Sequence, residues 1–119
     1  MYLNIRIFEW RRKMVKNNAA LAAFKKNIPL LDALSDERRQ QIMITLGESD
    51  AGLTVSELTK LIGLSQPAVS HHIKQLKDLN LVSVRKVGTS NIYQLTIKDA
   101  LAQVQELIDI LRKDKKLLR

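Results

Sequence analysis

Two predicted helices joined by a very short turn restrict the folds that this chain can adopt. Thr54–Glu57 has the pattern of a capping box, which predicts the start of a helix. Gly63 is suited to end that helix, and Ser65 is suited to begin a second one that runs to about Leu79. Two helices separated by three residues are typical of a helix-turn-helix. The apolar residues expected to seat the first helix are Val55, Leu58, Leu61 and Ile62.

The second helix of this pair has a polar face and an apolar face. Its polar residues follow the spacing i, i+4, i+5 and i+8, which places them on one side of a helix. They are Gln66, Ser70, His71 and Lys74. Gln and Ser can hydrogen-bond base edges in the major groove, so this face predicts a DNA-reading helix that begins with Ser65 and Pro67. A merely solvated polar face is the alternative. His72 is expected to point toward the scaffold as a hydrogen-bonded residue.

A β-hairpin is predicted directly after this helix. Residues 81–86 and 91–95 alternate between apolar and polar side chains with period two, and Gly88 lies between them. Beside a reading helix, a basic hairpin tip can contact the minor groove or its phosphates. The residues expected to do so are Arg85, Lys86, Thr89, Ser90 and Asn91. The alternative is that the hairpin is basic only for solubility, and Tyr93 is expected to pack beneath it.

The first third of the chain predicts further helices. Residues 1–16 have a helical spacing of apolar side chains, although part of this segment also alternates as a strand would. The side chains with helical spacing are Leu3, Ile7, Trp10 and Met14. Asn17–Asn18 can start a second helix, and Pro29 is expected to break it. Ser35 is expected to be the N-cap of a third helix.

The last predicted helix, residues 97–112, carries a continuous apolar stripe. Its members are Leu101, Val104, Leu107, Ile108 and Leu111. The stripe can belong to the core of one chain, but pairing of two chains would also bury it, at about 25 cal/mol per Å². We expect a homodimer, with Leu21 and Phe24 extending the interface. A two-fold axis would place two reading helices in successive major grooves about 34–36 Å apart.

Positive charge is segregated along the chain, which has a formal net charge of +8. Residues 1–26 hold seven basic and one acidic side chain, whereas residues 27–59 hold two basic and six acidic ones. Residues 60–91 hold five basic and one acidic, and residues 109–119 hold five basic and two acidic. The basic excess therefore lies on the helix-turn-helix and hairpin region and on both termini. This distribution favours a partner rich in phosphate, such as double-stranded DNA.

Several classes of protein are excluded or disfavoured by composition. The 119 residues include no Cys, which excludes disulfides, thiolate catalysis and Cys-based metal sites. No apolar run has membrane-spanning length and no signal-peptide pattern opens the chain, so a cytoplasmic protein without a membrane partner is expected. No catalytic triad, phosphate loop or carboxylate pair has a useful spacing, and an enzyme is therefore not expected.

The order of elements and several motifs resemble the ArsR/SmtB family of bacterial winged-helix repressors. The resemblance spans about residues 28–110. The segments that carry it are Leu31–Arg38, Thr54–Leu58, Leu61–Ile73 and Leu79–Arg85. It implies a mainly α winged helix-turn-helix with a small β-hairpin, acting as a dimer. It also implies that the Gln, Ser and first His of the reading helix face the major groove.

The chain departs from the metal sensors of that family. One of their sites needs Cys, which is absent here. Another needs Asp-x-His-x₁₀-His-x₂-Glu/His on the last helix, and counting from Asp99 the matching residues are Leu101, Arg112 and Lys115. An aliphatic side chain and two cations cannot ligate a divalent metal. We therefore expect no metal and no cofactor, and the sequence does not indicate a small-molecule inducer.

These observations together predict a homodimeric, sequence-specific transcriptional repressor that reads a palindromic operator. The alternative is a winged-helix module for protein interaction without specific DNA binding. Three regions are expected: a basic and aromatic helical extension over residues 1–27, the DNA-binding domain with its dimerisation helix over 28–112, and a basic tail over 113–119.

Overall fold

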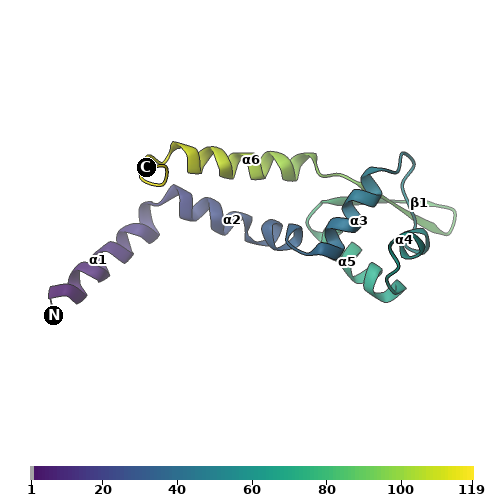
Figure 1. Ribbon diagram of the computed structural model, residues 1–119, viewed down its shortest axis with the longest axis horizontal. Coiled ribbons are helices and arrows are strands. Elements are labelled where there is room, and N and C mark those ends of the chain that lie inside the picture. Colours follow the sequence, from purple (N-terminus) through teal and green to yellow (C-terminus); the bar gives the residue numbers. More distant parts are fainter. Residues whose placement is uncertain (1) are drawn as a thin grey trace. The chain divides into compact units, whose positions relative to one another are not determined.

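The computed structural model describes the backbone of residues 2–119 and the side chains of residues 4–13 and 18–119. This part of the chain forms six helices and one antiparallel hairpin (Figure 1). The elements are α1 (Tyr2–Asn17), α2 (Ala19–Leu34), α3 (Glu37–Gly47), α4 (Val55–Ile62), α5 (Gln66–Asp78), β1 (Val82–Val87), β2 (Ser90–Leu95) and α6 (Lys98–Lys113). The predicted mainly α fold with a hairpin wing is confirmed.

The chain divides into two compact units. One, called the winged unit below, comprises residues 29–102; the other, called the helical unit, comprises residues 1–28 together with 103–119. The winged unit has a core drawn from α3, α4, α5 and the start of the wing. The residues that make this core are Ile42, Met43, Leu46, Leu58, Val69, Ile73, Leu76, Leu81 and Val82.

The helix-turn-helix forms as its end signals predict. The Thr54 hydroxyl accepts from the Glu57 backbone N–H at 3.1 Å, and the Glu57 carboxylate accepts from the Thr54 N–H at 3.1 Å. Gly63 ends α4 in the left-handed conformation, with φ +80°. Leu58 is fully buried, but Leu61 is 66% exposed, so the prediction that Leu61 helps to seat α4 is wrong. Leu58 faces the core. Leu61 is next to the last residue of α4, a helix of only two turns, and lies at the edge of the core.

Helix α3 begins one residue later than predicted. Its N-cap is Asp36, whose Oδ1 accepts from the Arg38 and Arg39 backbone N–H groups at 2.9 and 3.0 Å. The Ser35 hydroxyl donates instead to the Asp32 carbonyl at the end of α2. The Arg39 backbone bond is the main cause that lowers the pKa of Asp36, because it favours the charged carboxylate. The carboxylate is thus a better cap here than the neighbouring hydroxyl.

The Arg39 side chain links the three helices around it. Its guanidinium donates to the carbonyls of Ala33 and Asp32 at 2.9 Å each, at the end of α2. It also donates to Gln75 Oε1 at 2.9 Å, on α5. Arg is suited to this position because its planar group carries several donors in fixed directions. The contact fixes the C-terminal half of α5 against α3.

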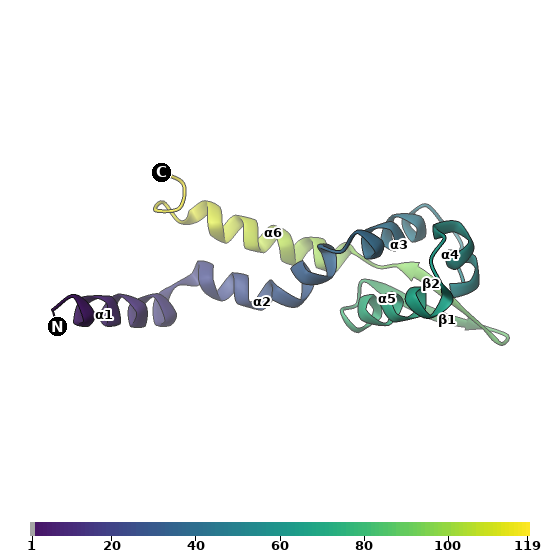
Figure 2. The same cartoon turned by 60° about the horizontal axis from the view of Figure 1, so that its bottom comes forward.

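The wing is a tight hairpin with a third, short pairing at its base. The β1–β2 register pairs Val82 with Leu95 and Val87 with Ser90, so only two residues form the turn. The hairpin extends beyond the helices of its unit (Figure 2). Leu53 and Tyr93 exchange both backbone hydrogen bonds, at 2.9 and 2.8 Å, and this bridge joins the segment before α4 to the wing.

In the helical unit, the first part of α2 and the last part of α6 run side by side in opposite directions (Figure 1, Figure 2). Asn27 is 2% exposed; its Nδ2 donates to the Ala23 carbonyl at 2.7 Å, and its Oδ1 accepts from Gln103 Nε2 at 2.9 Å. Lys26 and Glu106 form an exposed ion pair at 3.9 Å. The buried amide pair fixes the register of the two helices.

Two expectations for the first third of the chain had different outcomes. Residues 2–17 are helical, so the helical alternative is confirmed; Leu3 and Met14 of the predicted stripe lie outside the described side chains. The break expected at Pro29 is wrong, because α2 continues to Leu34. Leu30 and Ala33, buried on the turn that follows, supply packing that offsets the hydrogen bond lost at proline.

Candidate nucleic-acid interface

A polar groove lies where the starts of α4 and α5 meet the wing. It has a volume of about 500 Å³. The residues that line it are Thr54, Val55, Ser56, Gln66, Ser70, Thr89, Ser90, Asn91 and Tyr93. Five of them are predicted site residues, two from the reading helix and three from the hairpin, which are separated by about 20 residues in sequence. Most of the side chains offer a hydroxyl or amide group, so the groove can both donate and accept hydrogen bonds.

Helix α5 presents the predicted polar face to solvent from a rigid base. Gln66, Ser70, His71 and Lys74 are exposed. Val69, Ile73 and Leu76 on the opposite side are at most 2% exposed. Ser65 is the N-cap, and its hydroxyl accepts from the Ala68 N–H at 3.3 Å. Ser65 therefore has a structural role, whereas the four exposed residues are free to meet a partner.

The two adjacent histidines have different surroundings. His71 is exposed and His72 is half-buried, with their ring centroids 5.9 Å apart. Among the residues that the structure describes, the buried Nδ1 of His72 has no hydrogen-bond partner. The prediction of a hydrogen-bonded His72 is therefore wrong at this atom, because α5 turns the ring against its apolar side. His71 is the exposed histidine of the pair.

Arg85 has a contact within the chain that the sequence does not reveal. Its Nη2 donates to the Ala51 carbonyl at 2.8 Å, which ties β1 to the loop before α4. The guanidinium is exposed and retains further donors, but part of its role is to hold the wing. Lys86, the next residue, is also exposed. Lys86 is therefore the cleaner probe of a phosphate contact at the wing.

Four groove residues are absent from the sequence-based list of DNA contacts: Thr54, Val55, Ser56 and Tyr93. Thr54 and Ser56 belong to the start of α4, where the capping box revealed the helix but not its proximity to the wing. Tyr93 is half-buried beneath the hairpin, as expected, and also lines the groove. Gly52, just before the Leu53–Tyr93 bridge, is the signal that could have indicated a close backbone approach there.

Two other kinds of feature are absent from the described part of the chain. Within the described residues, no three His, Asp or Glu side chains are placed to hold a metal ion. None of the helices over residues 2–119 has the length and apolar character needed to cross a membrane. The helix pair α4–α5, the hairpin wing and the polar groove between them have the arrangement of a winged helix-turn-helix DNA-binding regulator.

Comparison with known proteins gives the family. The profile described as "Bacterial regulatory protein, arsR family" matches residues 36–84. The transcriptional activator HlyU of Vibrio cholerae is 34% identical over 96 residues, which are 81% of this chain and 82% of the relative. The arsenical resistance operon repressor of Staphylococcus xylosus is 35% identical over 89 residues, or 75% and 83% of the two chains. The chain belongs to the ArsR family of bacterial transcriptional regulators.

Solved structures agree with this assignment. An ArsR-like transcriptional regulator from Rhodococcus sp. RHA1 has a TM-score of 0.70 at 26% identity, and the match covers 82% of this chain and 88% of that one. HlyU from Vibrio cholerae has a TM-score of 0.55 at 32% identity, with 82% and 98% covered. The family and these relatives are transcriptional regulators and not enzymes.

Proposed function

We propose that this protein is a homodimeric transcriptional repressor that reads a palindromic operator through α5 and the wing. The observation that carries the proposal is the polar groove, because it brings Gln66 and Ser70 of α5 beside Thr89, Ser90 and Asn91 of the hairpin. A reading helix and a wing can then contact one DNA duplex together. DNA binding alone is sufficient to block a promoter, which is why repression is proposed.

The side chains of this surface have different proposed roles. Gln66, Ser70 and His71 contact base edges, with Gln66 able to form two hydrogen bonds to adenine. Lys74 and Lys86 contact phosphates and position the protein without selecting a sequence. Arg85 contributes to phosphate binding while it holds the wing. Ser65 and Pro67 fix the first turn of α5, and the wing residues Thr89, Ser90 and Asn91 follow the adjacent minor groove.

The helical unit and α6 are the proposed dimer interface. Phe24, Leu101 and Ile108 are 45, 57 and 37% exposed in the single chain, and they need a partner to be buried. Three further members, Leu21, Val104 and Leu111, are half-buried in the single chain. Leu107 is only 5% exposed already, so it contributes chiefly to the fold of one chain. The extension over residues 1–27 is proposed to contribute Leu21 and Phe24 to this interface, and residues 113–119 to follow it as a basic tail.

Salt dependence tests the phosphate contacts. Lys74→Gln and Lys86→Gln are each expected to weaken binding to all duplexes and to reduce the slope of log K against log salt by about 0.9 for each lost contact. Fluorescence anisotropy with labelled duplex over a range of salt concentrations measures both effects. Lys98→Gln is the matched control, because Lys98 is exposed at the start of α6 and outside the groove. Unchanged slopes for both variants would reject this face as the DNA contact.

Light scattering tests the dimer. The wild-type protein is expected to have twice the 13.6 kDa mass of one chain, and Phe24→Glu with Ile108→Glu is expected to have the mass of a monomer. Glutamate at an interface would be buried without a partner, which strongly disfavours association. Ile44→Glu is the control, since Ile44 is 64% exposed on α3 and lies outside the proposed interface. If the double variant stays dimeric, the interface lies elsewhere.

A further inference from the structure

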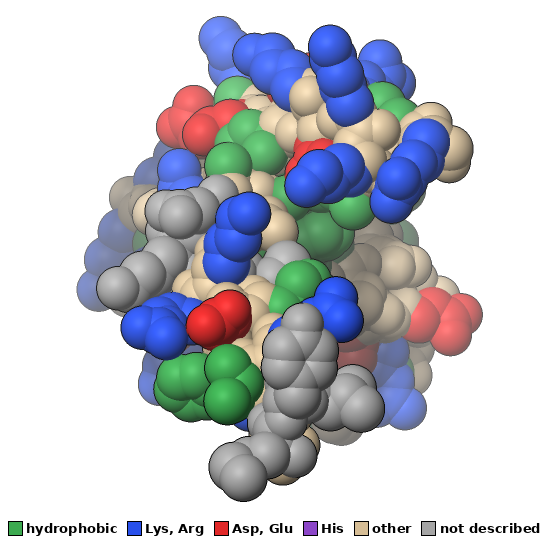
Figure 3. All heavy atoms as spheres, turned by 90° about the vertical axis from the view of Figure 1, so that its left-hand side faces the viewer, with side chains coloured by type: hydrophobic (Ala, Val, Ile, Leu, Met, Phe, Trp, Pro, Cys, Tyr) green, Lys and Arg blue, Asp and Glu red, His purple; other side chains and the backbone are tan. Residues whose placement is uncertain are grey.

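The net positive charge of the chain lies on the helical unit, whereas the winged unit as a whole has no net charge. Residues 29–102 hold eight basic and eight acidic side chains, whereas residues 1–28 and 103–119 together hold twelve basic and four acidic ones. The whole net charge of +8 thus falls on the part of the chain without the reading helix. Lys and Arg side chains spread over the surface seen from the side on which both termini lie (Figure 3). DNA reading by α5 does not explain this excess.

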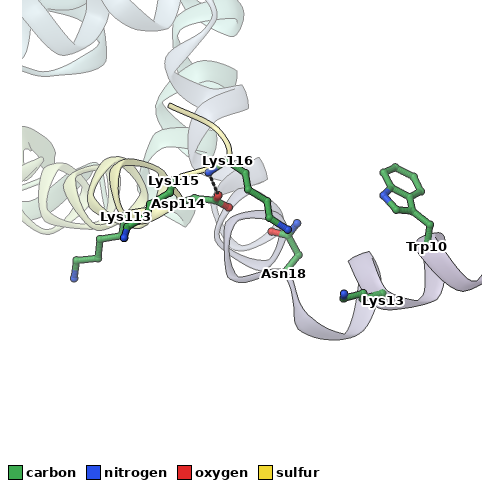
Figure 4. Close-up of a pocket in the computed structure, with 7 residues that line it drawn as sticks. All are labelled: Trp10, Lys13, Asn18, Lys113, Asp114, Lys115 and Lys116. Atoms are coloured by element: carbon green, nitrogen blue, oxygen red, sulfur yellow. Dashed lines mark hydrogen bonds between the residues drawn. The ribbon is translucent and has the colours of Figure 1, made fainter. Parts of the chain in front are cut away.

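A cleft in the helical unit gathers four of these cations. It has a volume of about 540 Å³ and is formed by α1, the start of α2 and the turn that follows α6. Its lining residues are Trp10, Lys13, Asn18, Lys113, Asp114, Lys115 and Lys116. Figure 4 shows Lys116 extending toward Asn18, whereas Lys113 points away from the other lining residues. The volume is in the range of sites for small ligands, about 300–1,000 Å³.

The charges in this cleft are not balanced within the chain. Across the described side chains, the ion pair found is Lys26–Glu106, which lies outside the cleft, and none of the four lysines forms one. Asp114, the single carboxylate of the lining, accepts a hydrogen bond from the Lys116 backbone N–H at 3.0 Å. Four ammonium groups around one carboxylate repel one another, and an anion bound between them would remove that repulsion.

We propose that this cleft binds a small anion with several phosphate groups. Lysine ammonium groups bind phosphate as point charges, and their long stems allow several to converge on one ligand. A compact anion with three or four negative charges matches the net charge of the lining, whereas a monovalent anion does not. The site would be separate from the α5 groove, since all its residues belong to the helical unit.

Trp10 makes the site directly measurable. It lines the cleft and is the only Trp in the sequence, so fluorescence excited selectively at tryptophan reports on this cleft. Titration of the full-length protein with tripolyphosphate at constant ionic strength is expected to give a saturable fluorescence change and a matching heat in calorimetry. The Lys115→Gln, Lys116→Gln double variant is expected to bind about tenfold more weakly, because two of the four charges are lost. Lys25→Gln, outside the cleft, is expected to bind as the wild type does.

Three outcomes would overturn the proposal. The first is the absence of a saturable signal in both fluorescence and calorimetry. The second is equal affinity in the double variant and the Lys25→Gln control. The third is the loss of tripolyphosphate binding when the protein is saturated with a DNA duplex, because the cleft would then bind DNA phosphates. The proposal instead expects the DNA-bound protein to bind tripolyphosphate with unchanged affinity. Failure of operator binding by the α5 variants would leave the first two results unaffected.

Discussion

Gln66→Ala is expected to lower the discrimination between the operator and a duplex substituted at one adenine by about 1–3 kcal/mol, or roughly 5- to 150-fold. Gln66 begins α5, is exposed, and lines the groove shared with the wing. An alanine at this position cannot form the paired hydrogen bonds that select adenine. The expected change is therefore a loss of sequence preference, with a smaller loss of affinity for unrelated DNA.

Competition binding with a set of singly substituted operators measures this effect. Ser70→Ala and His71→Ala are expected to change preference at neighbouring base pairs, because both side chains lie on the same exposed face of α5. Gln41→Ala is the matched control, since Gln41 is exposed on α3 and outside the groove. If Gln66→Ala keeps the wild-type ranking of all substituted operators, Gln66 does not read a base.

Gly52→Ala is expected to destabilise the winged unit by about 2–5 kcal/mol. Gly52 has φ +85°, which costs a residue with a side chain about 1–2 kcal/mol. A Cβ there would lie 2.7 Å from the Tyr93 carbonyl oxygen and from Ile92 Cγ2, so the wing would have to shift, at a further cost of about 1–3 kcal/mol. The Leu53–Tyr93 bridge would be the first contact to weaken.

Two other glycines separate the steric effect from the backbone effect. Gly63 and Gly88 also have positive φ, at +80° and +62°, but a Cβ at either would meet no atom within 4 Å. Gly63→Ala and Gly88→Ala are therefore expected to cost only about 1–2 kcal/mol. Urea unfolding followed by circular dichroism gives all three values. Equal losses in the three variants would show that close packing at Gly52 is unimportant.

Sequence patterns were sufficient to predict the structure of segments in which the deciding contacts join residues close together in the chain. The Thr54–Glu57 capping box, the stop at Gly63 and the start at Ser65 involve contacts within a few residues, and all three formed as predicted. The polar face of α5 followed in the same way from helical periodicity. The wrong prediction at Pro29 shows the limit of this reasoning, because packing of Leu30 and Ala33 outweighs the local cost.

Contacts between distant segments could not be predicted from periodicity. The Arg39–Gln75 bond and the Arg85–Ala51 bond join residues 36 and 34 positions apart, and neither end has a distinctive local pattern. Thr54 and Ser56 join the groove only because the Leu53–Tyr93 bridge brings the start of α4 to the wing. The cleft of the helical unit likewise depends on the meeting of both ends of the chain.

Selection of bound duplexes from a random DNA pool tests most directly whether this protein reads DNA as a two-fold dimer. The proposal predicts an enriched inverted repeat whose half-site centres are about 10–10.5 base pairs apart, the spacing of successive major grooves. It also predicts that Gln66→Ala relaxes the enriched sequence at one position in each half-site. A pool that shows no enriched sequence, or one that enriches a single unrepeated site, would contradict this account.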